Sequence, residues 1–182
     1  LIQFHARREP WLGREPLEGI ARFAEKNASY PYGCQVAEVE LDPDTGAVAI
    51  RHYLSVDDLG RVIHPAMAAG QLVGGIVQGL GQALYEHVRY DADSGQLMTA
   101  SFMDYTLPHA DEVPPIEIAI IDMPTANNSL RVKRAGECGT MGAAPPIINA
   151  IVDALAARGI RHIDMPATPR RVWEALHGTA AK

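Results

Sequence analysis

The stretch AAGQLVGGIVQGLGQALYEH, residues 68–87, decides the fold of this 182-residue chain. At about 100° per residue its apolar side chains fall on one side of a helical wheel, which predicts a helix over residues 65–87. The opposite side has a narrow stripe of glutamines with glycines beside it: Gln71, Gln78 and Gln82, flanked by Gly70, Gly74, Gly75, Gly79 and Gly81. An ordinary surface helix would carry Lys and Glu there.

The glycines of this helix need an explanation, because each costs about 1 kcal/mol of helix stability relative to alanine. One interpretation is tight packing against another helix, with a buried network of amides. The other is a flat ligand that lies against the backbone and is bound by the glutamine amides. A membrane span is excluded for this segment, since the glutamines interrupt an apolar run that is already too short.

Towards the N-terminus, the sequence predicts a β-hairpin over residues 34–56. Two runs of strand-forming residues flank the turn signal DPDTG at residues 42–46, where Asp and Gly suit a tight turn. Further upstream, the spacing of Leu17, Ile20, Ala21 and Ala24 predicts a helix over residues 16–28.

Towards the C-terminus, strands and helices follow in mixed order. We expect strand–turn–strand over 89–102, a short buried strand over 116–121, a loop over 127–142, a helix over 145–159 with prolines in its first turn, and a last helix from Thr168 to Gly178. The absence of a βαβ rhythm predicts the α+β class. We expect one domain over residues 1–182, with residues 1–30 as a less certain lead segment.

The composition excludes several classes of function. The net charge is −6 and no basic block occurs, which argues against nucleic-acid binding. The two cysteines, Cys34 and Cys138, form no CxxC pair, so an iron–sulfur cluster or zinc site built by this chain alone is not expected. The seven histidines form no metal-binding motif; for His64, before Pro65, the default role is at the surface or in a helix cap.

A lone carboxylate, Glu137, stands in the sparse stretch RAGECGTMGAAPP at residues 134–146. The residues alone leave three roles open for it. These roles are a general base, a metal ligand, and a loop acid paired with Lys133 or Arg134. The last role is the commonest for an isolated acid.

Four motifs, in this order, resemble the molybdenum-cofactor-binding subunit of the xanthine dehydrogenase family, near its C-terminus. They are VDDLGRVIHP (56–65), GQLVGGIVQGLGQALYE (70–86), SFMDYTLPHADEVPPIE (101–117) and KRAGECGTMGAAPPIINAIVDAL (133–155). The chain is most similar in character to carbon monoxide dehydrogenase large chains. The resemblance covers nearly everything from Tyr30 onward.

This resemblance implies a role for each matching residue. The family's active-site base beside molybdenum, which takes a proton from a metal-bound hydroxyl, matches Glu137. The glutamine that contacts the pterin matches Gln78, and Gln71 matches a second motif position. Gly75, Gly79, Gly139 and Thr140 would lie by the cofactor or substrate.

The implied cofactor is a molybdopterin with Mo, in the cytosine dinucleotide form usual in bacterial members, with the metal held by the pterin and no protein ligand. FAD and 2Fe-2S clusters would lie on partner chains. The remainder of the Mo subunit would be a further partner. The implied enzyme is a cytoplasmic molybdenum hydroxylase that uses water to oxidise an aldehyde, an N-heterocycle or a similar small molecule, with no membrane attachment.

The sequence also departs from the family pattern. Arg134 replaces a glycine, which reshapes the pocket or binds an anionic substrate group. The full subunit is several times longer, so this chain alone is expected to be inactive. The competing interpretation is a non-catalytic, free-standing remnant or interaction module without cofactor.

Overall fold

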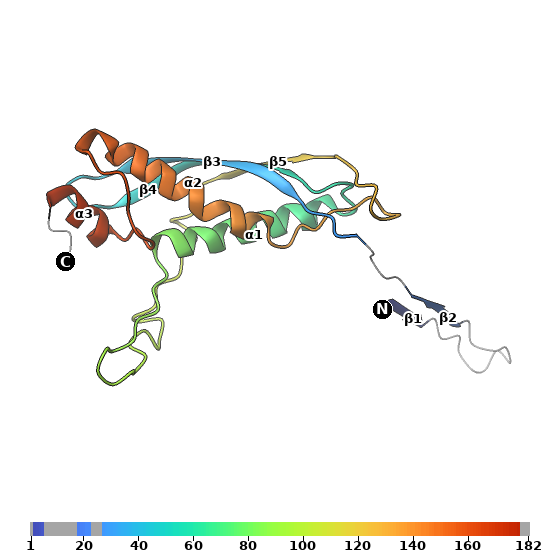
Figure 1. The fold of residues 1–182 in the computed structure, drawn as a ribbon, viewed down its shortest axis with the longest axis horizontal. Helices are drawn as coiled ribbons and strands as arrows, with labels where there is room; N and C mark the ends of the chain where they lie inside the picture. The colour runs from blue at the N-terminus through green and yellow to red at the C-terminus, as the bar shows by residue number, and fades with distance from the viewer. Residues whose placement is uncertain (1, 6–17, 23–26, 179–182) are drawn as a thin grey trace.

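A three-stranded sheet covered on one face by two long helices forms the body of the computed structural model (Figure 1). The structure describes residues 2–5, 18–22 and 27–178. The sheet has the order β3 (Tyr32–Leu41), β4 (Val48–Asp58) and β5 (Ile116–Ile121). The helices are α1 (Pro65–Leu84) and α2 (Cys138–Leu155). This mixture confirms the α+β class.

The predicted hairpin is confirmed and is slightly longer than expected, since β3 pairs antiparallel with β4. Its turn is closed by the Asp42 carboxylate, which accepts hydrogen bonds from the backbone N–H of Asp44 at 2.9 Å and the Thr45 hydroxyl at 2.7 Å. Gly46 has a φ of 74°, a left-handed conformation that glycine adopts without steric cost.

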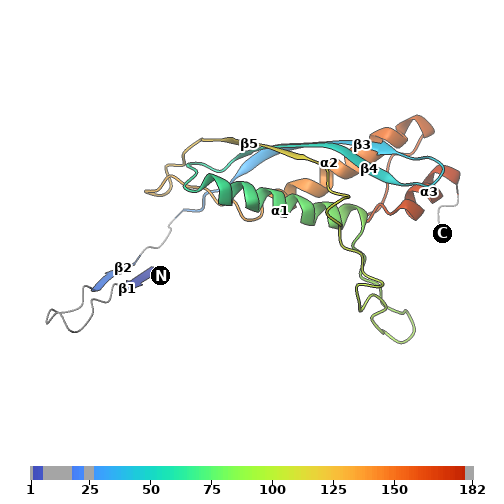
Figure 2. The same cartoon turned by 180° about the vertical axis from the view of Figure 1, so that it is seen from behind.

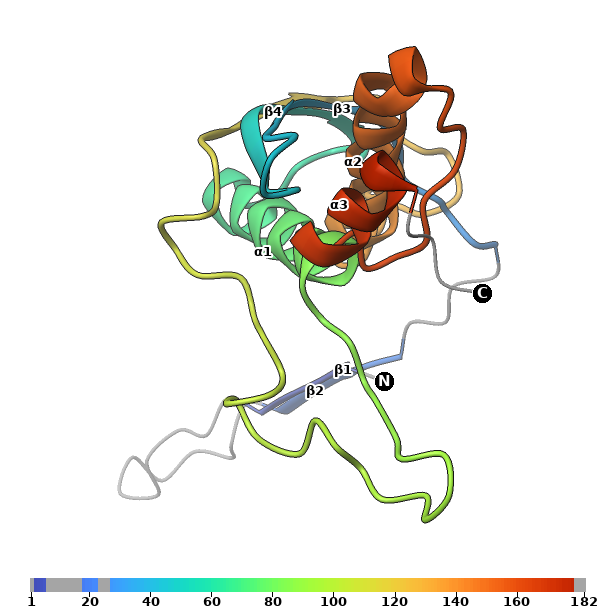
Figure 3. The same ribbon diagram turned by 90° about the vertical axis from the view of Figure 1, so that its left-hand side faces the viewer.

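Strands β4 and β5 are parallel, although the sequence shows no βαβ rhythm. The connection between them runs through α1 and then through an arm, residues 85–115, that projects away from the body (Figures 1 and 3). The strands predicted over 89–102 do not form, and only one isolated bridge joins Tyr90 to Leu97. A two-stranded ribbon without a covering layer is marginally stable, which accounts for this difference. Strand β5 is confirmed, but it is half-exposed and not buried.

Helix α1 follows the prediction and ends at Leu84, three residues earlier than His87. His64 is its N-cap, and the ring Nδ1 accepts a hydrogen bond from the Met67 N–H at 3.1 Å. The capping role expected for this histidine is therefore confirmed.

Helix α2 begins at Cys138 and not near Pro145, so part of the predicted loop over 127–142 is helical. Pro145 and Pro146 lie inside the helix, where each removes one helical N–H donor. The first two turns form nevertheless because Gly139 and Ala143 pack against α1. A short 3₁₀ helix, η2 (Ala156–Arg158), follows, and Gly159 with φ 80° ends it, as predicted.

The C-terminal helix α3 (Pro169–His177) is confirmed, with Thr168 as N-cap and Gly178 at its end. The predicted helix over 16–28 is wrong where the structure describes it: β2 (Glu18–Ala21) pairs antiparallel with β1 (Ile2–His5). Gly19 weakens a helix there and Ile20 favours a strand. The rest of the predicted helix, apart from residues 22, 27 and 28, lies outside the described residues. The β1–β2 pair stands apart from the body (Figure 2).

The core lies between the sheet and the helices, which run side by side beneath it (Figure 3). Its fully buried members include Tyr53, Ile76, Leu80, Ile147, Ile151, Leu155 and Val172. Among the described residues, one helix, over residues 138–158, is long and apolar enough to cross a membrane by length and composition. Its buried face, with Ile147, Ile151 and Leu155, belongs to this core.

Candidate functional site

Glu137 is the N-cap residue of α2 and its side chain is exposed. Its carbonyl accepts the first helical hydrogen bond, from the Met141 N–H at 3.0 Å, while its carboxylate makes no cap hydrogen bond. A carboxylate at a helix N-terminus is stabilised by the helix dipole. The early start of α2 thus places the acid at the beginning of a helix, where the sequence had predicted a loop.

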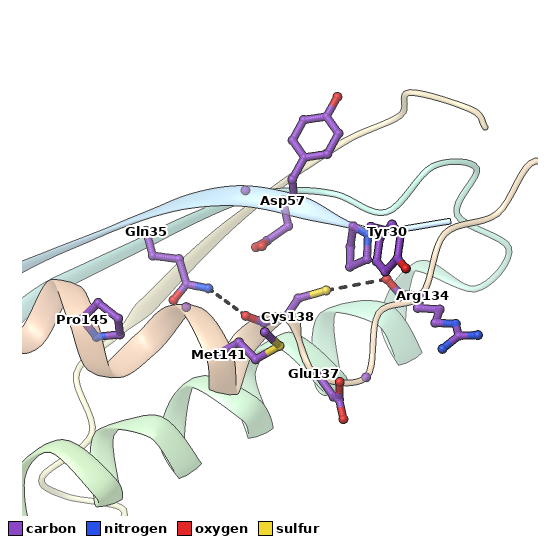
Figure 4. A pocket seen from close by; sticks show the side chains of 13 residues that line it. Tyr30, Gln35, Asp57, Arg134, Glu137, Cys138, Met141 and Pro145 are labelled. Atoms are coloured by element: carbon purple, nitrogen blue, oxygen red, sulfur yellow. Dashed lines mark hydrogen bonds between the residues drawn. The ribbon is translucent and has the colours of Figure 1, made fainter. Parts of the chain in front are cut away.

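A cleft of about 780 Å³ lies beside Glu137, between β3 and the start of α2. Its lining includes Tyr30, Tyr32, Gln35, Asp57, Arg134, Glu137, Cys138, Met141 and Pro145. Figure 4 shows that the Glu137 carboxylate points away from Asp57 and Gln35. The acid therefore stands at the rim of the cleft, whose lining combines polar groups such as Gln35 and Asp57 with a larger share of apolar surface.

The glutamine stripe of α1 is exposed at all three positions, so it is not a buried amide network. The Thr140 hydroxyl donates a hydrogen bond to Gln78 Oε1 at 3.1 Å, which joins two of the residues predicted to contact a cofactor. Thr140 is three residues after Glu137. Gln78 itself does not line the cleft beside Glu137.

A second cleft, of about 560 Å³, continues along the other side of α2. Gln82 and Thr140 line it, and Met141 and Pro145 line both clefts. The first cleft, with Glu137, and the second cleft, with Gln82, therefore adjoin at the first turns of α2.

The predicted cofactor glycines have a packing role in this structure. A Cβ on Gly75 would lie 2.8 Å from the Thr140 nitrogen, and one on Gly79 would lie 2.6 Å from the Ala143 Cβ. Gly139 faces the backbone of α1 equally closely. By contrast, an added Cβ on Gly70 or Gly74 would meet nothing within 4 Å. The helix-packing interpretation therefore holds at Gly75 and Gly79, whereas Gly70 and Gly74 have no packing role among the described residues. Cofactor contact at Gly75, Gly79 and Gly139 stays a prediction.

A partly buried polar network lies beside the start of α2. The Tyr53 hydroxyl donates to Gln35 Oε1 at 2.6 Å, and Gln35 Nε2 donates to the Cys138 carbonyl at 3.3 Å (Figure 4). Asp57, 2% exposed, accepts a hydrogen bond from the Ser55 hydroxyl. Burial raises the pKa of Asp57, and the Ser55 hydrogen bond opposes this in part.

The segment before Glu137 is held by an ion pair that sequence analysis missed. Lys133, considered above as a partner for Glu137, instead donates to Asp58, whose side chain is 1% exposed. Burial opposes ionisation of Asp58, but hydrogen bonds from Lys133 and the Gly60 N–H outweigh it and lower the Asp58 pKa. No sequence signal links the two residues, which are 75 positions apart.

Cys138, next to Glu137, has the small structural role that is usual for a partly buried thiol. Its Sγ donates to the Arg134 carbonyl at 3.6 Å. Burial, followed by the negative charge of Asp57, raises the pKa of the thiol, so it is not activated as a nucleophile. Within the described part of the chain, no three His, Cys, Asp or Glu side chains come together as a metal site would require.

Several solved oxidoreductase structures share this fold. The Cu,Mo-containing carbon monoxide dehydrogenase superposes with a TM-score of 0.85 at 32% identity, over 95% of this chain and 22% of that chain. Quinoline 2-oxidoreductase from Pseudomonas putida 86 gives a TM-score of 0.73 at 36% identity, over 76% of this chain and 18% of that one. The fold is therefore that of a molybdenum-cofactor-binding domain of the molybdenum hydroxylase class.

The sequence places the chain within a family of this class. The model of the molybdopterin cofactor-binding domain matches residues 5–114, and the chain belongs to that family. The nicotine 6-hydroxylase large subunit of Paenarthrobacter nicotinovorans is 40% identical over 91% of this chain, and the gamma subunit of the 6-hydroxypseudooxynicotine dehydrogenase complex of the same organism is 38% identical over 98%. The chain spans 20% and 23% of the lengths of these two relatives.

Proposed function

We propose that this chain is the C-terminal portion of a molybdenum hydroxylase large subunit, and that Glu137 is its active-site base. The enzyme would oxidise an aldehyde, an N-heterocycle or a similar small molecule, with water as the source of oxygen. The observation that carries this proposal is the position of Glu137: an exposed carboxylate at the start of α2, three residues before Thr140, whose hydroxyl donates a hydrogen bond to Gln78.

The uncovered face of α1 supports a cofactor contact. The exposed amides of Gln71, Gln78 and Gln82 can both donate and accept hydrogen bonds. Gly70 and Gly74 beside them leave open space where a side chain would stand. A polycyclic group such as a pterin needs this combination of polar groups and close backbone approach, so we assign cofactor contacts to Gln78, Gln71 and Thr140.

The residues of this chain would supply the proton transfer and the orientation of the cofactor. When bound, a molybdopterin would supply the two-electron oxidation and hold its own metal. Glu137 would accept the proton released as the oxygen–carbon bond forms, as a positioned carboxylate can. Arg134, on the lining of the same cleft, would bind an anionic group of the substrate or shape the entrance.

Other parts of the proposal concern the assembly. We propose the cytosine dinucleotide form of the cofactor, partner subunits with FAD and 2Fe-2S clusters, and a cytoplasmic location. The relatives support an assembly, because their names identify them as subunits of larger enzymes. The remaining walls of the site would come from the rest of the large subunit.

The test of the base is Glu137→Gln in the full-length enzyme. Turnover is expected to fall by roughly 10²–10⁴-fold, the usual contribution of a positioned general base, while the Mo and nucleotide content stays unchanged. Glu117→Gln, an exposed acid on β5, is the matched control and should keep full activity. Unchanged turnover of Glu137→Gln would remove the base assignment. Native protein that contains no Mo would remove the enzymatic proposal itself, whereas Mo without releasable cytidine monophosphate would remove only the cytosine dinucleotide form.

A further inference from the structure

We propose that the buried pair of Asp58 and Lys133 positions the Glu137 carboxylate, by fixing the segment that enters α2. This inference rests on the proposed function of Glu137 as a base. Both residues are positioning residues, since neither reaches the carboxylate itself. Residues 58–61 at the end of β4 contact residues 131–133.

The two segments are joined along their backbones. The Lys133 N–H donates to the Leu59 carbonyl at 2.9 Å, and the Arg61 N–H donates to the Arg131 carbonyl at 3.0 Å. The Asp58 carboxylate completes this contact, because it accepts from the Gly60 N–H at 2.9 Å and from the Lys133 ammonium group. One carboxylate therefore ties the end of β4 to the segment that leads to Glu137.

The same segment is constrained from its other side. The Asn128 side chain bonds both the N–H and the carbonyl of Val132, at 3.1 and 2.9 Å. Arg131 has a φ of 60°, and a non-glycine residue persists in this left-handed conformation only where its surroundings enforce it. The chain at 131–133 is thus held in one conformation by contacts on both faces.

Between this anchor and α2 lie only Arg134, Ala135 and Gly136, and an added Cβ on Gly136 would meet nothing within 4 Å. Downstream, Gly139 is packed against the backbone of α1. Glu137 therefore sits between two fixed points. Loss of the upstream one would let its carboxylate move without unfolding α2, and such displacement is costly for a catalytic group.

Cys138 offers a built-in reporter of this segment, because it adjoins Glu137 and is partly buried, whereas Cys34 is exposed on β3. The experiment measures alkylation of each thiol by iodoacetamide, read by mass spectrometry of its peptide, in the full-length protein. In Asp58→Asn and Lys133→Met, the Cys138 rate should rise about tenfold, the scale of one lost charge-assisted hydrogen bond. The Cys34 rate should not change.

Three further variants separate positioning from general stability. The double variant Asp58→Asn/Lys133→Met leaves no unpaired buried charge, so it should recover much of the lost melting temperature while Cys138 stays reactive. Lys133→Arg keeps the positive charge, so the alkylation rate of Cys138 should stay at the wild-type value. Glu40→Gln, which breaks the exposed Arg51–Glu40 pair, is the matched control. It should change neither the alkylation rates of the two thiols nor the melting temperature.

The proposal is overturned if the alkylation rate of Cys138 in both single variants equals that of wild type. It is also overturned if the alkylation rate simply rises as the melting temperature falls across all variants. In the holoenzyme, Asp58→Asn should lower kcat about tenfold or more with KM within about twofold, since the substrate contacts remain. If Glu137→Gln proves active, the proposed base is lost, but the thiol measurement still decides whether this pair fixes the segment.

Discussion

Two adjacent glycines of α1 offer a decisive test of why this helix is rich in glycine. Gly74 is exposed, and an added Cβ would meet nothing within 4 Å. Gly75 is buried, and its Cβ would lie 2.8 Å from the Thr140 nitrogen and 3.0 Å from the Gly139 Cα. Both are mid-helix positions, so replacement by alanine adds the same helix propensity, about 1 kcal/mol.

The environments of these glycines decide the sign of each change. For Gly74→Ala only the propensity gain remains, so the free energy of unfolding should rise by about 1 kcal/mol. For Gly75→Ala the atoms in the way are backbone atoms of α2, which cannot rotate aside, and overpacking of this kind costs about 1–3 kcal/mol. Because the propensity gain cancels between the two variants, Gly75→Ala should be about 1–3 kcal/mol less stable than Gly74→Ala.

Urea unfolding followed by far-UV circular dichroism would measure this difference, with equal slopes as a check that both variants unfold in the same way. In thermal unfolding the difference corresponds to roughly 3–9 °C, at about 3 °C per kcal/mol for a domain of this size. If Gly75→Ala were as stable as Gly74→Ala or more stable, the helix contact would not be the reason for Gly75. The buried glycines would then have to be explained by a ligand alone.

Two further predictions concern stability elsewhere in the chain. Gly46→Ala should be strongly destabilising, because the φ of Gly46 is 74° and an added Cβ would clash with the Pro169 carbonyl oxygen. Gly95 has a similar φ of 70° but open space around it, so Gly95→Ala should lower the free energy of unfolding by only about 1–2 kcal/mol, measured by thermal unfolding. Equal losses in the two variants would contradict the contact of Gly46 with α3. Since the folded state raises the Asp57 pKa, the unfolded chain releases this proton first as pH rises, and wild-type stability should fall relative to Asp57→Asn as the pH rises above about 4, the ordinary carboxyl pKa. A difference between the two proteins that does not change with pH, in urea unfolding across this range, would refute the effect of burial on Asp57.

Local signals in the sequence were sufficient for the elements whose structure depends on neighbouring residues. The DPDTG turn and its two strands form as expected, because Asp42 and Gly46 satisfy the turn within five residues. The caps of α3 form for the same reason. The roles of Glu137 and Gln78 could be proposed from the motifs alone, because the order of motifs along the chain is a property of the sequence.

Local signals misled where packing outweighs propensity. Pro145 and Pro146 are typical of a first helical turn, yet α2 starts at Cys138 because its first turns pack against α1. Glu137 is consequently the N-cap residue of a helix and does not lie within a loop. The strands expected over residues 89–102 do not form, because in the projecting arm they have no layer of the protein to pack against (Figure 1).

The sequence by itself determined the amphipathic helix with its glutamines and the family to which the motifs point, and it singled out Glu137 and Gln78 as candidates. Only the tertiary structure decided which glycines touch a neighbouring backbone and which stand open. It also decided that Lys133 pairs with Asp58 rather than with Glu137. The physical reason is that these choices depend on contacts between residues 60 or more positions apart, and neither helical periodicity nor turn chemistry carries information over that distance.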